Sequence, residues 1–308
     1  MTASTHARRP SGRQTRIAAI CFSLTFMSSF GQTFFIALFG DEIRAKFGLS
    51  DGGFGLLYSC ATLASGILMI WAGSVVDRVS FRHYSVAAAI ILATAAFLFA
   101  RADSLALMGL AIFGLRLGGQ GMMSHAAQIG AARAFDRSRG RALGLTNLGH
   151  PAGEAIFPPA AVAALSVLAW PSLWTVAAAL ALLLALFYSR VVPTGLRSAQ
   201  AGPAARAAGF DDDTASEGRD WTRAQVLRDR RFHLLLPALM GPGFVSTGIF
   251  FHQLPLIAEK GWSLGLYASA FTAFALGVSV AMIGSGALVD RWGDRKSTRL
   301  NSSHVCSS

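Results

Sequence analysis

Charged residues are scarce in this sequence of 308 residues. They make up 14% of the chain, whereas about 25% is usual for a soluble domain. Hydrophobic residues make up 53%, and the mean hydropathy is +0.48. This composition excludes an ordinary soluble domain and makes the lipid bilayer the expected solvent.

The sequence has few cysteines and lacks recognisable catalytic motifs. Cys21, Cys60 and Cys306 are too scattered for a disulfide framework and lack the spacing of zinc ligands. Paired metal-binding histidines and a Ser-His-Asp arrangement are missing as well. We therefore expect no metal, no cofactor and no enzymatic activity, and a membrane-embedded enzyme or sensor is the weakest alternative.

Acidic residues are outnumbered by basic ones. The chain has 16 Asp and Glu against 27 Lys and Arg, which gives a formal net charge of +11. Such an excess could indicate nucleic-acid binding, but nearly all the basic residues lie between apolar runs. That arrangement controls membrane topology, so we expect no nucleic-acid partner.

Long apolar runs account for most of the chain. A membrane helix needs roughly 20 mainly apolar residues to cross about 30 Å of hydrocarbon. The basic start lacks a small-x-small cleavage site and is interpreted as the flank of an uncleaved first span. The sequence predicts an all-α membrane protein with spans at residues 17–39, 54–76, 84–100, 105–131, 142–165, 170–189, 232–257 and 264–289.

Arginines gather in alternate loops between these spans. They are frequent before the first span and in the loops 77–83, 132–141 and 190–231, whereas the other loops are neutral or balanced by acidic residues. Basic residues in short loops stay on the cytoplasmic side. We therefore predict a multi-pass protein of the bacterial inner (plasma) membrane with a cytoplasmic N terminus.

A polar segment divides the spans into six and two, as in transporters built from two halves. The expected units are a cytoplasmic N terminus, a six-helix bundle, a cytoplasmic linker, two helices of a second bundle, and a tail, at residues 1–16, 17–189, 190–231, 232–293 and 294–308.

Two similar motifs support this division as an internal repeat. Residues 73–78 (Gly-Ser-Val-Val-Asp-Arg) end the second span, and residues 286–291 (Gly-Ala-Leu-Val-Asp-Arg) end the eighth. Both copies occupy the second-span position of their half, which chance does not usually produce.

The motif resembles the signature loop of the major facilitator superfamily, roughly G-x-x-x-D-R-x-G-R-[RK]. The resemblance implies the two-bundle fold of that family and a loop that acts as a conformational latch between the halves. Alternatively, Asp77 and Arg78 only flank a cytoplasmic helix end. The matching positions are Gly73, Asp77, Arg78 and Arg82 in the first copy and Gly286, Asp290 and Arg291 in the second.

Charged residues inside the spans are candidates for a solute or proton pathway. Arg116 and Gln120, in the fourth span, fit a second pattern of the family, R-x-x-x-Q-G. An arginine at this depth needs an acceptor. Glu154 lies at a similar expected depth in the fifth span, one helical turn after His150. Arg116, His150 and Glu154 form either a functional cluster, or a static Arg116 to Glu154 ion pair with His150 nearby.

The fifth span carries further polar and helix-bending residues. Asn147, with Gln32 of the first span, extends the candidate pathway. The span is loosely similar to an antiporter signature, G-x-x-x-G-P-x-x-G-G, but its proline is displaced by one position and Glu154 replaces a glycine. Pro158 and Pro159 remove two backbone donors, so we expect a kink.

The end of the chain differs in character from the rest. Residues 294–304 resemble one reading frame of a widely used sequencing adapter. We therefore expect the native reading to end near Gly293 and the natural protein to continue into four more spans. A genuine polar tail is the alternative.

Together these features predict a secondary active transporter that moves a small solute by alternating access. Proton coupling is expected through His150 or Glu154, and an organic anion is favoured because of Arg116. The alternative is proton-driven efflux of hydrophobic compounds. We expect a monomer whose partners are a small solute, protons and lipid.

Overall fold

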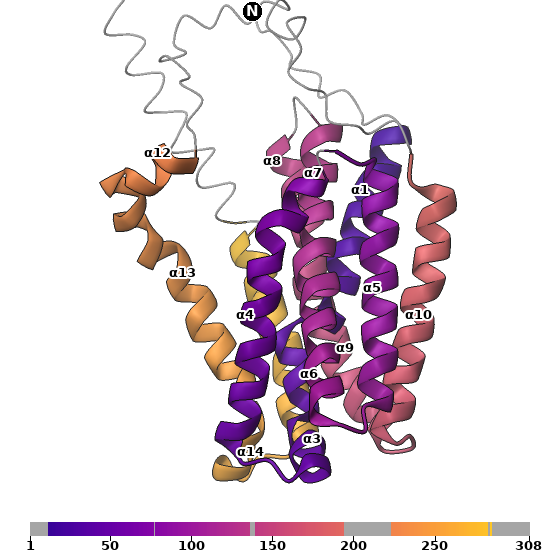
Figure 1. Ribbon diagram of the computed structural model, residues 1–308, viewed down its shortest axis with the longest axis vertical. Helices are drawn as coiled ribbons and strands as arrows, with labels where there is room; N and C mark the ends of the chain where they lie inside the picture. Colours follow the sequence, from indigo (N-terminus) through magenta and orange to yellow (C-terminus); the bar gives the residue numbers. More distant parts are fainter. Residues whose placement is uncertain (1–11, 77, 136–138, 194–222, 283, 285–308) are drawn as a thin grey trace, which may run out of the picture.

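The computed structural model describes residues 12–76, 78–135, 139–193, 223–282 and 284. Every regular element in these ranges is a helix (Figure 1). In chain order they are α1 Gly12–Met27, η1 Ser28–Gly31, α2 Thr33–Ile36, η2 Ala37–Phe39, α3 Gly40–Phe47, α4 Asp51–Val75, α5 Phe81–Arg101, α6 Leu105–Leu115, η3 Arg116–Met123, α7 Ser124–Ala134, α8 Arg139–Asn147, α9 Gly149–Leu165, α10 Trp170–Val191, α12 Arg223–Arg228, α13 Arg230–Phe251, α14 Gln253–Lys260, and a last helix, Leu264–Met282.

The predicted all-α membrane architecture is confirmed. Within the described ranges, six helices are long and apolar enough to cross a membrane, and the bent pair of Gly12–Gly31 and Thr33–Phe47 makes a seventh span. The predicted fifth span is present as α8 and α9, of 9 and 17 residues. Backbone hydrogen bonds link these two helices across Leu148, so they form one interrupted span.

The first predicted span is bent rather than straight. Its two parts meet at 42°, and Gln32 between them is extended, with φ −86° and ψ 153°. The bend lies beside Gly119 of the π-helical segment η3, in the middle of the fourth span. A Cβ built on Gly31 would lie 2.8 Å from the Cα of Gly119. The two backbones are therefore in direct contact, which only glycine allows.

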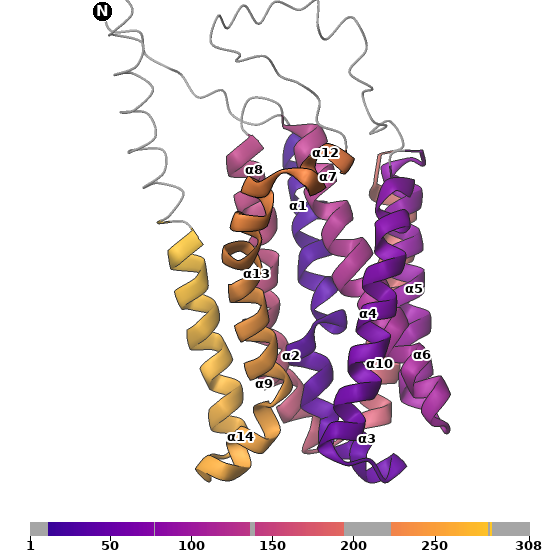
Figure 2. The same cartoon turned by 60° about the vertical axis from the view of Figure 1, so that its left-hand side comes forward.

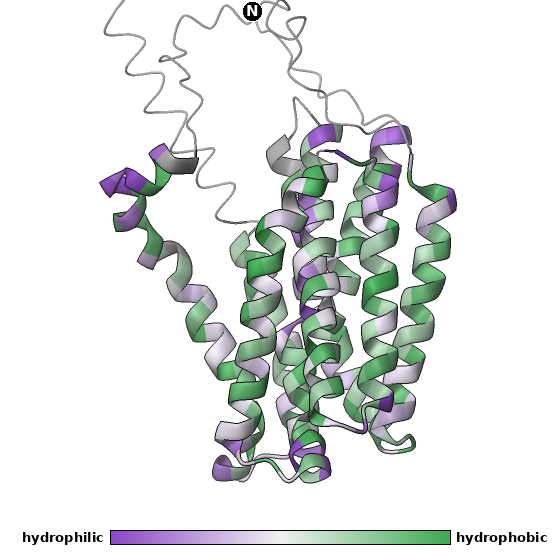
Figure 3. Ribbon diagram, in the orientation of Figure 1, coloured by the Kyte–Doolittle hydropathy of each residue, from purple (hydrophilic) through white to green (hydrophobic). Residues whose placement is uncertain are grey.

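The core of the first bundle is an alanine-rich helix pair capped by aromatic rings. The helices α5 and α10 pack closely against each other, and their facing alanines are buried. Trp174 of α10 is fully buried, with its ring centroid 5.4 Å from Phe35 and 4.3 Å from Phe99. Large apolar side chains such as Leu63 and Trp71 are exposed on the outside, where Figure 3 shows mostly hydrophobic ribbon. These surfaces suit contact with lipid.

Helix α13 meets the first bundle at one end only. Near α14 the rings of Phe54 and Phe251 stack at 5.2 Å, and Gln253 Nε2 donates to the carbonyl of Phe34 at 3.0 Å. Toward α12, α13 leans away from α4 (Figure 1), and it runs beside the last helix in Figure 2. The helices that meet at the α14 end thus diverge toward the end where α1 begins.

We predict that Gly119→Ala destabilises the protein. Alanine is normally the better helix former, but a Cβ here would lie 2.7 Å from Gly31 Cα and 2.9 Å from its nitrogen. Overpacking of this kind costs about 1–3 kcal/mol. Thermal unfolding in detergent should show a lower midpoint for Gly119→Ala than for the control Gly66→Ala, whose Cβ meets nothing within 4 Å. Equal midpoints would contradict the close contact.

Candidate functional site

A cavity of about 390 Å³ lies between the first bundle and the helices after the linker. We call it the central cavity. Helices α7, α8 and α9 form one wall, and α13 and the last helix form the other. The described residues that line it are Gln128, Asn147, His150, Pro151, Glu154, Ser246, Phe250, Phe274, Val278 and Met282.

Three prolines shape the α8–α9 wall. Proline has no N–H, so Pro151, Pro158 and Pro159 leave the carbonyls of Asn147, Glu154 and Ala155 without their usual helical donors. The Ala155 carbonyl instead accepts from Thr272 Oγ1 of the last helix at 3.0 Å. Helix α9 continues through Pro158 and Pro159, where the kink was predicted, and the break in the fifth span lies earlier, after Asn147. At Ala155 a side chain of the opposite wall supplies the missing donor.

His150 is contacted by Ser28 of η1, in the first span. Ser28 Oγ donates to the carbonyl of Thr25 at 2.6 Å, and it lies 3.4 Å from His150 Nδ1. The Ser28 hydroxyl donates or accepts in this contact according to which ring nitrogen of His150 carries the proton.

Glu154 is the acidic residue of the cavity wall. It is half-buried, and within the described part of the chain its carboxylate has no hydrogen-bond or ion-pair partner. Asn147 and Gln128 line the same cavity. Three predicted pathway residues, Asn147, His150 and Glu154, are therefore brought together.

Arg116 lies apart from this group. Its side chain is 7% exposed, and Nη1 donates to the Gly31 carbonyl at 3.2 Å and to Thr33 Oγ1 at 3.3 Å. The guanidinium lies 5.6 Å from the ring centroid of Tyr58, whose hydroxyl also donates to Thr33. The static ion pair considered with Glu154 is absent from the described residues, because Arg116 is engaged by the bend of the first span.

The other predicted pathway residues are not in the cavity wall. Gln32 is half-buried at the bend, and Gln120 is exposed on η3. Sequence reasoning missed Tyr58, which supports Arg116, and Ser246 and Thr272, which contribute from the second group of helices. The sequence does not mark these three residues, because single hydroxyl side chains in membrane helices usually make hydrogen bonds between packed helices.

The predicted gating loop is described in part. Gly73 packs near His125, with 3.5 Å between a built Cβ and the imidazole ring. Arg78 is exposed, and Arg82 Nε donates to the Val192 carbonyl at 2.7 Å. Arg133 of α7, which the prediction omitted, donates to the carbonyl of Val76 at the end of α4. Asp77, Gly286, Asp290, Arg291 and the adapter-like residues 294–304 lie outside the described residues.

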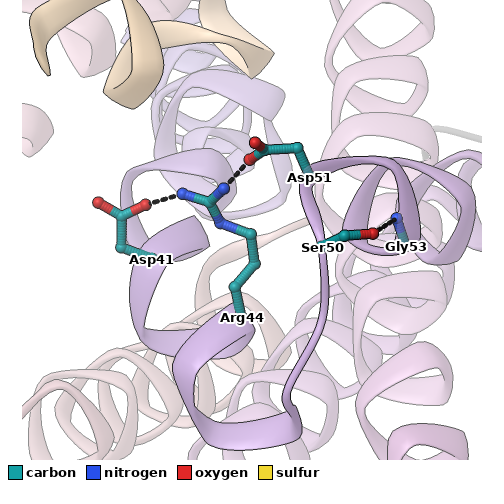
Figure 4. Close-up of polar contacts among 5 residues, drawn as sticks. All are labelled: Asp41, Arg44, Ser50, Asp51 and Gly53. Atoms are coloured by element: carbon teal, nitrogen blue, oxygen red, sulfur yellow. Dashed lines mark hydrogen bonds and ion pairs between the residues drawn. The ribbon is translucent and has the colours of Figure 1, made fainter.

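An ionic cluster holds the opposite end of the first bundle. Arg44 of α3 pairs with Asp41 on its own helix and with Asp51 at the start of α4 (Figure 4). Ser50 caps the same helix by accepting from Gly53 N at 3.1 Å. These contacts fix the turn between the first two spans beside the point where α14 approaches.

Comparison with known proteins identifies the family. The family model described as Major Facilitator Superfamily matches residues 21–305. The chain belongs to the major facilitator superfamily. Its fold also resembles the crystal structure of a bacterial homolog of the human lysosomal transporter Spinster in an inward-facing, unoccupied conformation, with a TM-score of 0.63 and 19% identity. No curated protein matches the chain.

The likeness to the Spinster homolog concerns the fold alone. The match covers 93% of this chain and 64% of that one. Membership of the major facilitator superfamily confirms the resemblance seen in the sequence.

We predict that Arg116→Met lowers stability more than Tyr58→Phe does. Arg116→Met leaves the Gly31 carbonyl and the Thr33 hydroxyl without their charged donor, at a cost of about 1–3 kcal/mol. Tyr58→Phe keeps an aromatic face beside the guanidinium and loses one hydroxyl contact. Thermal unfolding in detergent measures both. An unchanged midpoint for Arg116→Met would show that this arginine does not hold the bend.

Proposed function

We propose that the protein moves a small solute across the membrane by alternating access around the central cavity. The observation that carries the proposal is that the cavity is lined both by the first bundle and by the helices after the linker. Aromatic contacts join these two groups of helices at the α14 end, and the groups diverge toward the α12 end. Rocking of one group against the other would exchange which end is open.

The open end is assigned to the cytoplasm. It is the end where α1 begins and where α4, α7 and α10 end (Figure 1), and the sequence that follows each of these three helices is rich in arginine, as expected from the positive-inside rule. We propose a monomer in a bacterial inner membrane, with the units 1–16, 17–189, 190–231 and 232–293 predicted above.

Glu154 is proposed to carry a coupling proton. A lone carboxylate in a wall that loses water when the cavity closes is costly in its charged form. Protonation removes that cost, so closure and proton binding favour each other. His150 is the other titratable side chain among the described lining residues, one helical turn away on α9.

The substrate assignment depends on what lines the cavity. The preference for an organic anion rested on Arg116, whose guanidinium is engaged at the bend, and no Arg or Lys is among the described lining residues. Efflux of hydrophobic compounds is favoured by the apolar wall of Phe250, Phe274 and Val278. The gating role of Gly73 to Arg82 and of Gly286 to Arg291 is proposed from the family motif.

We predict that Glu154→Gln uncouples transport from protons. Proteoliposomes would be given an imposed pH gradient and a panel of radiolabelled small aromatic amines and carboxylates, with protein-free liposomes subtracting passive entry. The parent protein should accumulate at least one of these solutes in response to the gradient, and Glu154→Gln should lose that response because glutamine cannot exchange a proton.

The matched control is Glu259→Gln, the same change at an exposed position of α14 outside the cavity wall, which should behave as the parent. Gradient-driven accumulation that persists in Glu154→Gln would exclude Glu154 as the proton carrier.

A further inference from the structure

The one carboxylate among the described lining residues of the central cavity is that of Glu154, while the amides of Gln128 and Asn147 can both donate and accept. Glu154 offers a carboxylate without a partner in the described residues. His150 contacts Ser28 through Nδ1 at 3.4 Å, and its ring can accept or donate according to its protonation. Ser246 Oγ donates to the Pro242 carbonyl at 2.8 Å, which leaves its oxygen able to accept. A solute in this cavity therefore meets acceptors from both walls.

Proline adds backbone acceptors to the same wall. Pro151 and Pro158 give no N–H to the carbonyls of Asn147 and Glu154, and both of these residues line the cavity. A freed carbonyl in this helix does take a donor from elsewhere, as Thr272 shows at Ala155. Asn147 and Glu154 thus each have a backbone carbonyl without its usual helical donor.

The apolar part of the cavity is aromatic. The rings of Phe250 and Phe274 lie 5.7 Å apart at 88°, and both line the cavity. The face of an aromatic ring carries partial negative charge and attracts a desolvated cation. With no Arg or Lys among the described lining residues, the charge balance of the wall is negative or neutral.

We propose that the central cavity binds an organic monocation, an ammonium group on an apolar or aromatic body. The ammonium donates to Glu154 and to neighbouring acceptors, and the body lies against Phe250 and Phe274. The volume of about 390 Å³ accommodates a small organic molecule. The inference rests on the proposed function, since it names the solute class of the same cavity.

The test compares three probes of similar size that differ in charge: 2-phenylethylammonium, 2-phenylethanol and phenylacetate. Their binding to the purified chain in lipid nanodiscs would be measured at neutral pH by calorimetry. We expect the ammonium to bind at least about tenfold more tightly than the alcohol or the carboxylate, because a hydrogen bond between charged groups is stronger than a neutral one.

Two variants locate the effect. Glu154→Gln should weaken ammonium binding at least about tenfold and leave alcohol binding unchanged, whereas the exposed control Glu259→Gln should bind all three probes as the parent does. Thermal unfolding of each variant checks that it is folded. Should Glu154→Gln unfold, Ser246→Ala replaces it, with a smaller loss of ammonium binding expected.

Several results would overturn the inference: equal or tighter binding of phenylacetate, no measurable binding of the ammonium, or full ammonium binding in a folded Glu154→Gln variant. The proton role of Glu154 fails separately, through transport that ignores the pH gradient. Charge preference in binding and proton dependence in transport therefore distinguish the two proposals.

Discussion

The arrangement of the first bundle depends on how the bend at Gly31 and Gln32 is stabilised. Unwound backbone inside a membrane needs internal hydrogen-bond partners because lipid offers none. Arg116 supplies one by donating to the Gly31 carbonyl, and the close approach of Gly119 brings η3 into position. The bend and the buried arginine, each unfavourable alone, stabilise one another.

This solution determines which residues are free for solute. Because Arg116 is committed to the bend of the first span, at η1 and α2, the α8–α9 wall becomes the polar side of the central cavity. That wall is itself irregular, since Pro151 interrupts the fifth span directly after Asn147. Membrane proteins tolerate irregular helices where the freed carbonyls face a cavity or accept from a neighbouring side chain. The hydrogen bond from Thr272 Oγ1 to the Ala155 carbonyl is an example.

The sequence predicted the helices better than their contacts. Apolar length located the membrane helices of the described ranges, because it follows directly from the thickness of the bilayer. The bend at Gln32 and the π-helical segment η3 were not predicted, because they arise from a glycine contact between two distant helices. Equal depth suggested a pair between Arg116 and Glu154, but depth leaves open which face of a helix a residue occupies. His150 and Glu154 were grouped correctly because helical spacing does fix the face.

The one carboxylate among the described lining residues of the cavity limits how the proposed transport can be coupled. On the proposed assignments, a proton and an organic cation both neutralise Glu154, so they compete for it. Closing the cavity over a charged Glu154 that binds neither a proton nor a cation is costly. The two groups of helices would therefore exchange conformation when one of these ligands is bound, and rarely when neither is. Because the two ligands cannot bind together, the outward movement of one is linked to the inward movement of the other. On these assignments, exchange of protons for cations would need only Glu154, the one carboxylate among the described residues of the cavity wall.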